Sequence, residues 1–202
     1  MKLYYAPGAC SMAPHIAMRE AGLSFELEKV DLASKRTSKG VDYTGINPKG
    51  YVPALRLDSG EILTEACVIL QFLADQKPES DLAPPCGTLE RYRLMEWLNF
   101  ISSEIHKQLG PLFTPRINPE WHDNQVALLG RRFTYLSESI GKKPYLLGEN
   151  FSAADAYLFT VLRWCEPLHV NLGRWPSLEG YLARVASRPA VKEALDAEGL
   201  KD

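Results

Sequence analysis

The sequence predicts an α/β domain followed by an all-helical domain. Up to residue 76 it alternates strand-like and helix-like patterns. The segment "KPESDLAPPCGTLE" then has prolines and a glycine without periodicity, as interdomain linkers do. Beyond it every periodic segment is helical. We therefore expect an α/β domain over residues 1–80, a linker over 81–86 and a helical domain over 87–202.

The first domain begins with a strand–helix–strand pattern. "KLYYA" is short, apolar and aromatic, which is typical of a buried strand. Residues 11–21 favour a helix, because Pro14 falls in its first turn and Gly22 follows its end. "SFELEKVDL" alternates like a second strand. This order favours a parallel pair of strands joined by a right-handed crossover.

The remaining elements follow the same reasoning. "YVPALRLDSGEIL" contains two strand-like runs around Asp58-Ser59-Gly60, which indicates a hairpin. "TEACVILQFLADQ" is apolar around most of its circumference and predicts a helix packed against the sheet. Further helices are expected over residues 89–109, 120–140, 153–166, 177–187 and 189–197. Ser152 and Asp155 form a capping-box-like start for the third of these.

Composition excludes several classes of function. The 202 residues are 46% hydrophobic and carry a net charge of −2, so neither nucleic acid nor a membrane surface is an expected partner. No apolar run approaches the ~20 residues of a membrane helix, and no secretory signal is expected. Cys10, Cys67, Cys86 and Cys165 have no C-x-x-C spacing and form no metal-ligand cluster with the histidines. We expect no metal, and reduced thiols in the cytoplasm.

Cys10 lies just before the first helix, and its position has two interpretations. Unpaired N–H groups and the helix dipole favour negative charge there, which would stabilise a thiolate. Alternatively, Cys10 is a small buried hydrophobic residue, as most free cysteines are. Position alone does not decide between them.

Two further motifs are equally open. Pro53 begins a strand, and a cis Val52–Pro53 bond would let the Val52 backbone pair with an extended peptide, although most such bonds are trans. Thr64 and Glu65 precede a helix, so the Ala66 N–H and the Glu65 carboxylate together match an α-amino-acid head group. The simpler alternative is that Glu65 only complements the helix dipole.

The helix over residues 89–109 has one apolar and one polar stripe. The polar stripe contains Asn99, Ser103 and His106, with Glu104 and Lys107 beside it. A polar row on a helix this aromatic indicates a face that lines a cleft, whereas the commoner alternative is a solvated face.

The order of these motifs resembles that of the cytosolic glutathione S-transferases. "KLYYAPGACS", "NPKGYVPAL", "LTEA", "ADQKP", "EWLNFISSEIHK", "DAYLFTVLRW" and "RPAVKEAL" are similar to the bacterial beta class in particular. The resemblance spans essentially the whole chain. It implies a thioredoxin-like domain, a helical domain, and a homodimer with an active site at each domain cleft. It also implies conjugation of glutathione, as co-substrate, to small hydrophobic electrophiles.

The resemblance also implies roles for individual residues. The catalytic residues would be Cys10, Ser11 and His106. Lys35, Val52 and Pro53 would hold the peptide backbone of glutathione, and Glu65 and Ala66 its γ-glutamyl group. The long helix would contribute Asn99, Ser103, Glu104, Ile105 and His106, with Glu104 reaching the ligand of a neighbouring subunit. Candidates for the second-substrate pocket are Phe113, Tyr157 and Trp164.

Other functions remain open at this point. Ala66-Cys67 departs from the glycine or serine followed by a non-cysteine residue in many members, but the expected contact at position 66 is a backbone N–H. Residue 13 is alanine, so dithiol cycling is not expected. Cys10 could instead support monothiol chemistry with glutathione: reduction of mixed disulfides or peroxides, or dehalogenation. A further alternative is a non-catalytic protein that binds hydrophobic compounds.

Overall fold

The N-terminal half of the molecule is built on a mixed five-stranded sheet. A computed structural model describes residues 1–115 and 117–200. The strands are β1 (Lys2–Tyr5), β2 (Glu26–Asp31), β3 (Arg36–Thr37), β4 (Ala54–Arg56) and β5 (Ile62–Thr64), in the order β3-β2-β1-β4-β5. β1 and β2 are parallel and the other neighbours are antiparallel. The predicted strand–helix–strand opening and the hairpin are confirmed.

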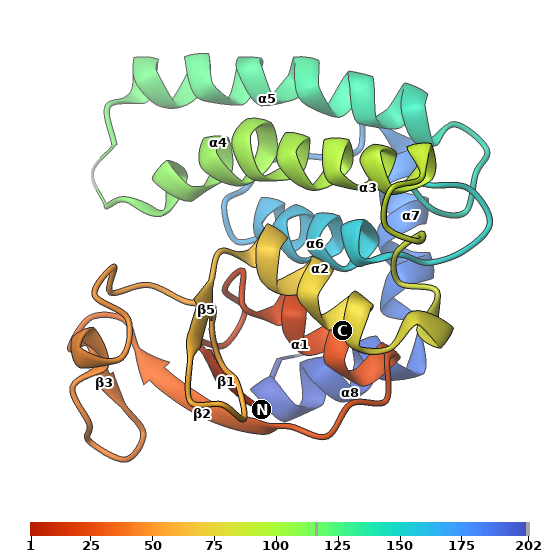
Figure 1. Cartoon of the computed structure of the whole chain (residues 1–202). Coiled ribbons are helices and arrows are strands. Elements are labelled where there is room, and N and C mark those ends of the chain that lie inside the picture. The colour runs from red at the N-terminus through yellow and green to blue at the C-terminus, as the bar shows by residue number, and fades with distance from the viewer. Residues whose placement is uncertain (116, 201–202) are drawn as a thin grey trace.

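Helices cover the sheet and build the second half of the chain (Figure 1). α1 (Met12–Glu20) connects β1 to β2, and α2 (Ala66–Gln76) follows β5. The helical half contains α3 (Leu89–Phe100), α4 (Lys107–Leu109), α5 (Pro119–Ile140), α6 (Ala153–Leu162), α7 (Pro176–Ala186) and α8 (Pro189–Glu198). This is the predicted architecture of a thioredoxin-like domain followed by a helical domain.

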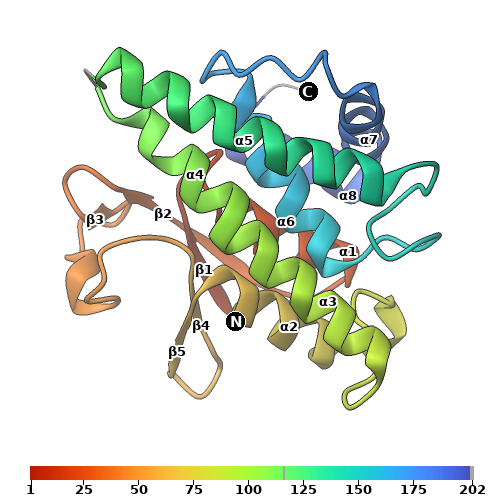
Figure 2. The ribbon, with the colours of Figure 1, turned by 90° about the horizontal axis from the view of Figure 1, so that it is seen from above.

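The long helix predicted over residues 89–109 is present but not uniform. Between α3 and α4, Ile101–His106 has π-helical hydrogen bonding, so the three pieces form one continuous rod. Seen from above, this rod runs alongside α5 (Figure 2). Similarly, the helix predicted over 153–166 ends as α6 at Leu162 and continues as a 3-10 turn.

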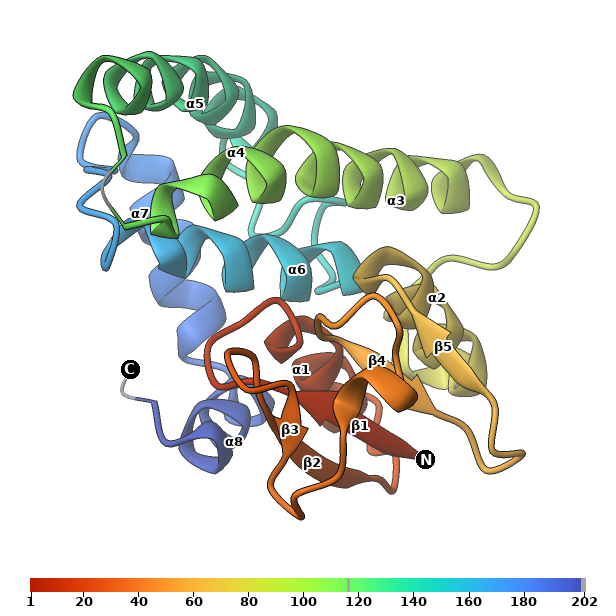
Figure 3. The same ribbon diagram turned by 90° about the vertical axis from the view of Figure 1, so that its left-hand side faces the viewer.

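The two halves share one hydrophobic core. α6 and α8 both pack against α1, so the last helix of the chain lies beside the N-terminal domain (Figure 3). The largest cluster of buried apolar side chains includes Leu3 of the sheet, Ile16 of α1, Leu158 of α6 and Leu195 of α8. The domain boundaries given above stay a prediction, because packing runs across them.

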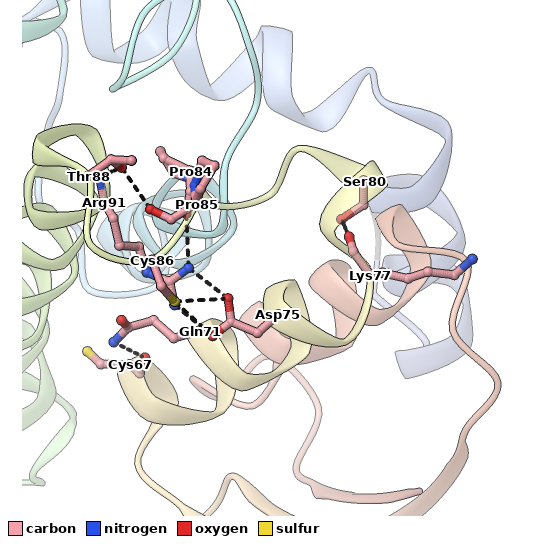
Figure 4. Close-up of polar contacts among 10 residues, drawn as sticks. All are labelled: Cys67, Gln71, Asp75, Lys77, Ser80, Pro84, Pro85, Cys86, Thr88 and Arg91. Carbon is pink, nitrogen blue, oxygen red and sulfur yellow. Dashed lines mark hydrogen bonds and ion pairs between the residues drawn. The ribbon is translucent and has the colours of Figure 1, made fainter.

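The linker is fixed to α2 by a half-buried ion pair (Figure 4). The Arg91 guanidinium donates to both Asp75 carboxylate oxygens at 2.8 Å and to the Pro84 carbonyl at 3.1 Å. Bidentate contacts of this kind hold orientation as well as charge. α3 is therefore oriented relative to α2, and both helices contribute to the cleft described below.

The capping box at the start of α6 is confirmed. The Asp155 carboxylate accepts hydrogen bonds from the Ser152 N–H at 2.9 Å and the Ser152 hydroxyl at 2.6 Å. It also accepts from the Leu146 N–H and the Tyr181 hydroxyl. Asp155 is fully buried, so α6 starts at a fixed point in the core. No helix in the described parts of the chain is long and apolar enough to cross a membrane.

Candidate active site

The loop between β1 and α1 is anchored at Gly8 from the helical half. The Gly8 N–H donates to the Glu198 carboxylate of α8 at 2.9 Å, and the Trp164 indole N–H donates to the Gly8 carbonyl at 2.8 Å. Gly8 has φ +70°, a conformation that side chains disfavour. These contacts fix the backbone that leads into Cys10.

Cys10 is half-buried and lies at the start of α1. Its thiol donates to the Val52 carbonyl, with Sγ and O 3.2 Å apart. Burial raises the pKa of Cys10 to about 12, against smaller opposing effects of backbone N–H groups and the Lys107 cation. Cys10 is thus a neutral thiol at physiological pH. The helix N-terminus does not outweigh desolvation here.

The Val52–Pro53 peptide bond is cis. Val52 itself is buried, and its carbonyl faces the Cys10 thiol. The preceding Tyr51 carbonyl accepts from the Tyr43 hydroxyl at 3.0 Å and the Asn47 side-chain amide at 2.7 Å. Side chains of the preceding loop therefore fix the backbone that leads into Val52.

Glu65 precedes α2 in a strained backbone conformation, with φ +71°. Its carboxylate accepts from the Lys49 ammonium at 2.5 Å and the Tyr51 hydroxyl at 2.9 Å, and it does not cap the helix. The hydrogen bond from Lys49 lowers the pKa of Glu65, so the carboxylate is ionised. Ala66 begins the helix, so its N–H has no acceptor within the helix. A carboxylate and a free N–H thus adjoin each other.

His106 ends the π-helical segment and lies between the aromatic rings of Tyr157 and Trp164. Its Nδ1 is 2.6 Å from the Tyr157 hydroxyl, and its ring centroid is 4.8 Å from that of Trp164. Burial, with the nearby Lys107 cation, lowers the pKa of His106 to about 4. The imidazole is therefore neutral at physiological pH.

These groups line one cleft between the two halves, with a volume of about 850 Å³. Ten of the residues singled out in the sequence contribute to its wall: Cys10, Val52, Pro53, Glu65, Ala66, Asn99, His106, Phe113, Tyr157 and Trp164. The polar stripe of the long helix thus faces a cleft at Asn99 and His106, rather than bulk solvent alone.

Five other candidates lie outside this lining. Ser11 is fully buried, and its hydroxyl accepts from the Ala6 N–H and donates to the Ala6 carbonyl, so it holds the loop instead of facing the cleft. Ile105 is also fully buried. Lys35 donates to the Gly50 carbonyl, and Ser103 donates to the Asn99 carbonyl. Glu104 pairs with Arg132 of its own chain at 2.6 Å. Their contacts with a ligand stay a prediction.

Sequence reasoning missed several cleft residues. Tyr51 and Ser102 line the cleft, and the Lys49 ammonium donates to the Glu65 carboxylate. Lys107, expected only beside the polar stripe, also lines the cleft. Ser102 was passed over for Ser103, one position further along the same helix. Both serines lie in the π-helical segment, and nothing in the local sequence marks that segment.

Comparison with known proteins matches both halves of the chain. The model of the glutathione S-transferase N-terminal domain matches residues 8–76, and that of the C-terminal domain matches residues 100–189. The chain belongs to the glutathione S-transferase family, and its fold is that of a bacterial beta class member. The resemblance seen in the sequence is confirmed.

Individual relatives cover the whole chain. It is 46% identical to glutathione S-transferase GstA of Escherichia coli O157:H7, over 100% of both chains. The beta class glutathione S-transferase of Sphingomonas chungbukensis superposes with a TM-score of 0.95, at 47% identity over 100% of both chains. A sphingomonad glutathione S-transferase complexed with glutathione has the same TM-score, at 46% identity and the same coverage.

Proposed function

We propose that this chain conjugates the thiolate of glutathione to small hydrophobic electrophiles in the cleft between its two halves. One observation carries the proposal: Cys10, Val52, the Glu65-Ala66 pair and His106 come from four separate segments of the chain and line one cleft. Each matches one part of the tripeptide. A relative of the same length and fold is complexed with glutathione.

The γ-glutamyl group would bind at the start of α2. Its carboxylate would accept from the free N–H of Ala66, and its ammonium would contact the ionised Glu65. The peptide backbone would lie along Val52 and Pro53. That placement brings the cysteine sulfur toward the Cys10 thiol, and His106 lines the same cleft.

Conjugation requires a thiolate, which the protein has to stabilise. An ordinary thiol has a pKa near 8.5, and lowering it by about two units takes roughly 2.7 kcal/mol. The Cys10 thiol, the His106 imidazole, the Lys107 ammonium and the N-terminus of α1 are the available donors and charges. The glutathione sulfur then attacks the electrophilic carbon, forms a thioether and expels the leaving group with its electron pair.

The second substrate would bind against the aromatic wall. Phe113 is half exposed, and its ring packs edge-on against Trp164, with centroids 5.6 Å apart. Flat apolar surface of this kind favours aromatic electrophiles.

Monothiol chemistry at Cys10 is the second candidate, because the thiol lies inside the glutathione cleft. In that reaction the Cys10 thiolate would attack a disulfide and form a mixed disulfide, releasing the other thiol. The raised pKa of Cys10 disfavours this step, because the thiolate is the nucleophile.

Turnover with 1-chloro-2,4-dinitrobenzene and glutathione tests the proposal. We expect conjugation in the wild type, and in Cys10→Ala we expect conjugation to persist while any thioltransferase activity is lost. Tight glutathione binding without turnover would instead identify a binding protein. Loss of conjugation together with thioltransferase activity in Cys10→Ala would make Cys10 indispensable for both reactions.

We also propose a homodimer in the cytoplasm, without nucleic acid or membrane partners. The support for the dimer is an aromatic cluster in which Trp97 and Phe100 of the rod are half-buried and contact the exposed Tyr135 of α5. Tyr135 is 50% exposed, and Tyr92, on the same rod, is 58% exposed. Aromatic side chains are enriched at protein interfaces.

A further inference from the structure

We infer that Tyr157 is a positioning residue that fixes the His106 proton on Nε2, so that His106 presents an N–H donor to the cleft. This inference rests on the proposed function, because it assumes that the glutathione sulfur binds beside His106. It gives Tyr157 a role other than lining the second-substrate pocket.

The contact between the two side chains is set by rigid elements. Tyr157 lies on α6, whose residues are all buried, and only 2% of its own surface is exposed. His106 is held by the rod. The hydroxyl oxygen is 2.6 Å from Nδ1, and the two rings meet edge-on at 86°. Burial therefore fixes the Tyr157 side chain beside the imidazole.

The direction of this hydrogen bond follows from the buried phenol. A tyrosine hydroxyl has one hydrogen to donate, and within residues 1–115 and 117–200 its one recorded acceptor is His106 Nδ1. A proton on Nδ1 would leave the phenol hydrogen unpaired, at a cost of about 1–3 kcal/mol. The phenol therefore donates, Nδ1 accepts, and the single proton of the neutral imidazole lies on Nε2.

The surrounding groups are consistent with this direction. Burial dominates the raised pKa of Tyr157, which keeps the phenol protonated. The nearby Ser102 hydroxyl opposes part of that shift.

Nε2 is left open to the cleft. It has no recorded partner, yet no buried side-chain nitrogen or oxygen of the described residues lacks one, so Nε2 must be accessible. The imidazole lines the cleft. An N–H group fixed in advance beside a developing or existing anion stabilises it without reorganisation. His106 thus acts as a donor to the thiolate and not as a base that removes its proton.

The test is Tyr157→Phe, which removes only the hydroxyl. Part of the His106 population then presents a lone pair to the sulfur. We expect the pKa of the bound glutathione thiol, followed by thiolate absorbance, to rise by about half a unit to one unit. Below that pKa, kcat/KM for 1-chloro-2,4-dinitrobenzene should fall about three- to tenfold, and the two enzymes should converge at high pH. An unchanged pH profile would overturn the inference.

Tyr181→Phe is the matched control. Tyr181 is also fully buried, and its hydroxyl also makes a hydrogen bond, to Asp155 outside the cleft. Its removal should lower the melting temperature and leave the thiol pKa unchanged. A pKa shift of equal size in Tyr181→Phe would mean that destabilisation alone moves the profile, which contradicts the role given to Tyr157.

Substitution of His106 separates this inference from the proposed function. Gln places an amide N–H near the position of Nε2, and Asn places one near that of Nδ1, so His106→Gln should retain more activity than His106→Asn. Tyr157→Phe should add little in the His106→Gln background. Higher activity in His106→Asn than in His106→Gln would refute the assignment of the proton to Nε2, even if Tyr157→Phe fails to fold. If His106→Phe leaves the bound thiol pKa unchanged, the proposed position of the sulfur is wrong as well.

Discussion

At the scale of single residues, desolvation decides the chemistry of the cleft. Cys10 has the position of an activated thiol, yet burial raises its pKa to about 12. His106 has the residue type of a general base, yet burial lowers its pKa to about 4. Both side chains are therefore neutral near pH 7 and act as hydrogen-bond donors. A sequence gives the residue type but not its desolvation, so neither state was predictable.

The reactivity of Cys10 toward iodoacetamide tests its protonation state. Only the thiolate reacts, so below pH 12 the rate at Cys10 should rise about tenfold per pH unit. At pH 7 the exposed Cys86 should be modified well before Cys10. Mass spectrometry of the ligand-free protein distinguishes the two sites. A rate at Cys10 that levels off below pH 9 would contradict the raised pKa.

At the scale of secondary structure, the start of α6 is the clearest local determinant of stability. Ser152→Ala removes the hydroxyl that donates to the buried Asp155 carboxylate and caps the helix. We expect the free energy of unfolding to fall by about 2–3 kcal/mol, because the buried Asp155 carboxylate loses a donor in addition to the lost helix cap. Urea denaturation measures it.

Thr88→Ala is the comparison for that experiment. Thr88 caps α3 by accepting from the Arg91 N–H, at a partly exposed position where water can replace it. This variant should lose only about 1 kcal/mol. Equal losses of stability in the two variants would show that the hydrogen bond to the buried Asp155 carboxylate contributes nothing beyond the cap.

Most elements were predictable, because periodicity and caps are local signals. The strands other than β3, together with α1, α2 and α5 to α8, follow from alternation, Pro and Gly positions and the capping box. The cis bond at Pro53 and the π-helical turn at Ile101–His106 were not predictable from these signals. Neither is marked by local periodicity or by capping residues.

At the scale of the whole molecule, the shared core predicts that both halves unfold together. α1 packs against α6 and α8, so a separated N-terminal half would expose much of its core. All 4 tryptophans lie in the helical half. Their fluorescence reports on that half alone, whereas far-ultraviolet circular dichroism reports on both. The two signals should change at the same urea concentration. A circular dichroism signal that changes at a lower urea concentration than the fluorescence would mean that the sheet domain unfolds independently.

The aromatic cluster of Trp97, Phe100 and Tyr135 predicts which substitution dissociates the proposed dimer. Tyr135 contacts Trp97 and Phe100, with ring centroids 5.9 and 5.1 Å away, and is half exposed. Tyr135→Glu would place a charge in an apolar interface, where desolvation makes it unfavourable. Sedimentation velocity should then find a monomer at concentrations where the wild type is a dimer. Trp121→Glu is the control, because Trp121 is 42% exposed at the other end of α5. Dissociation by Trp121→Glu but not by Tyr135→Glu would place the interface elsewhere.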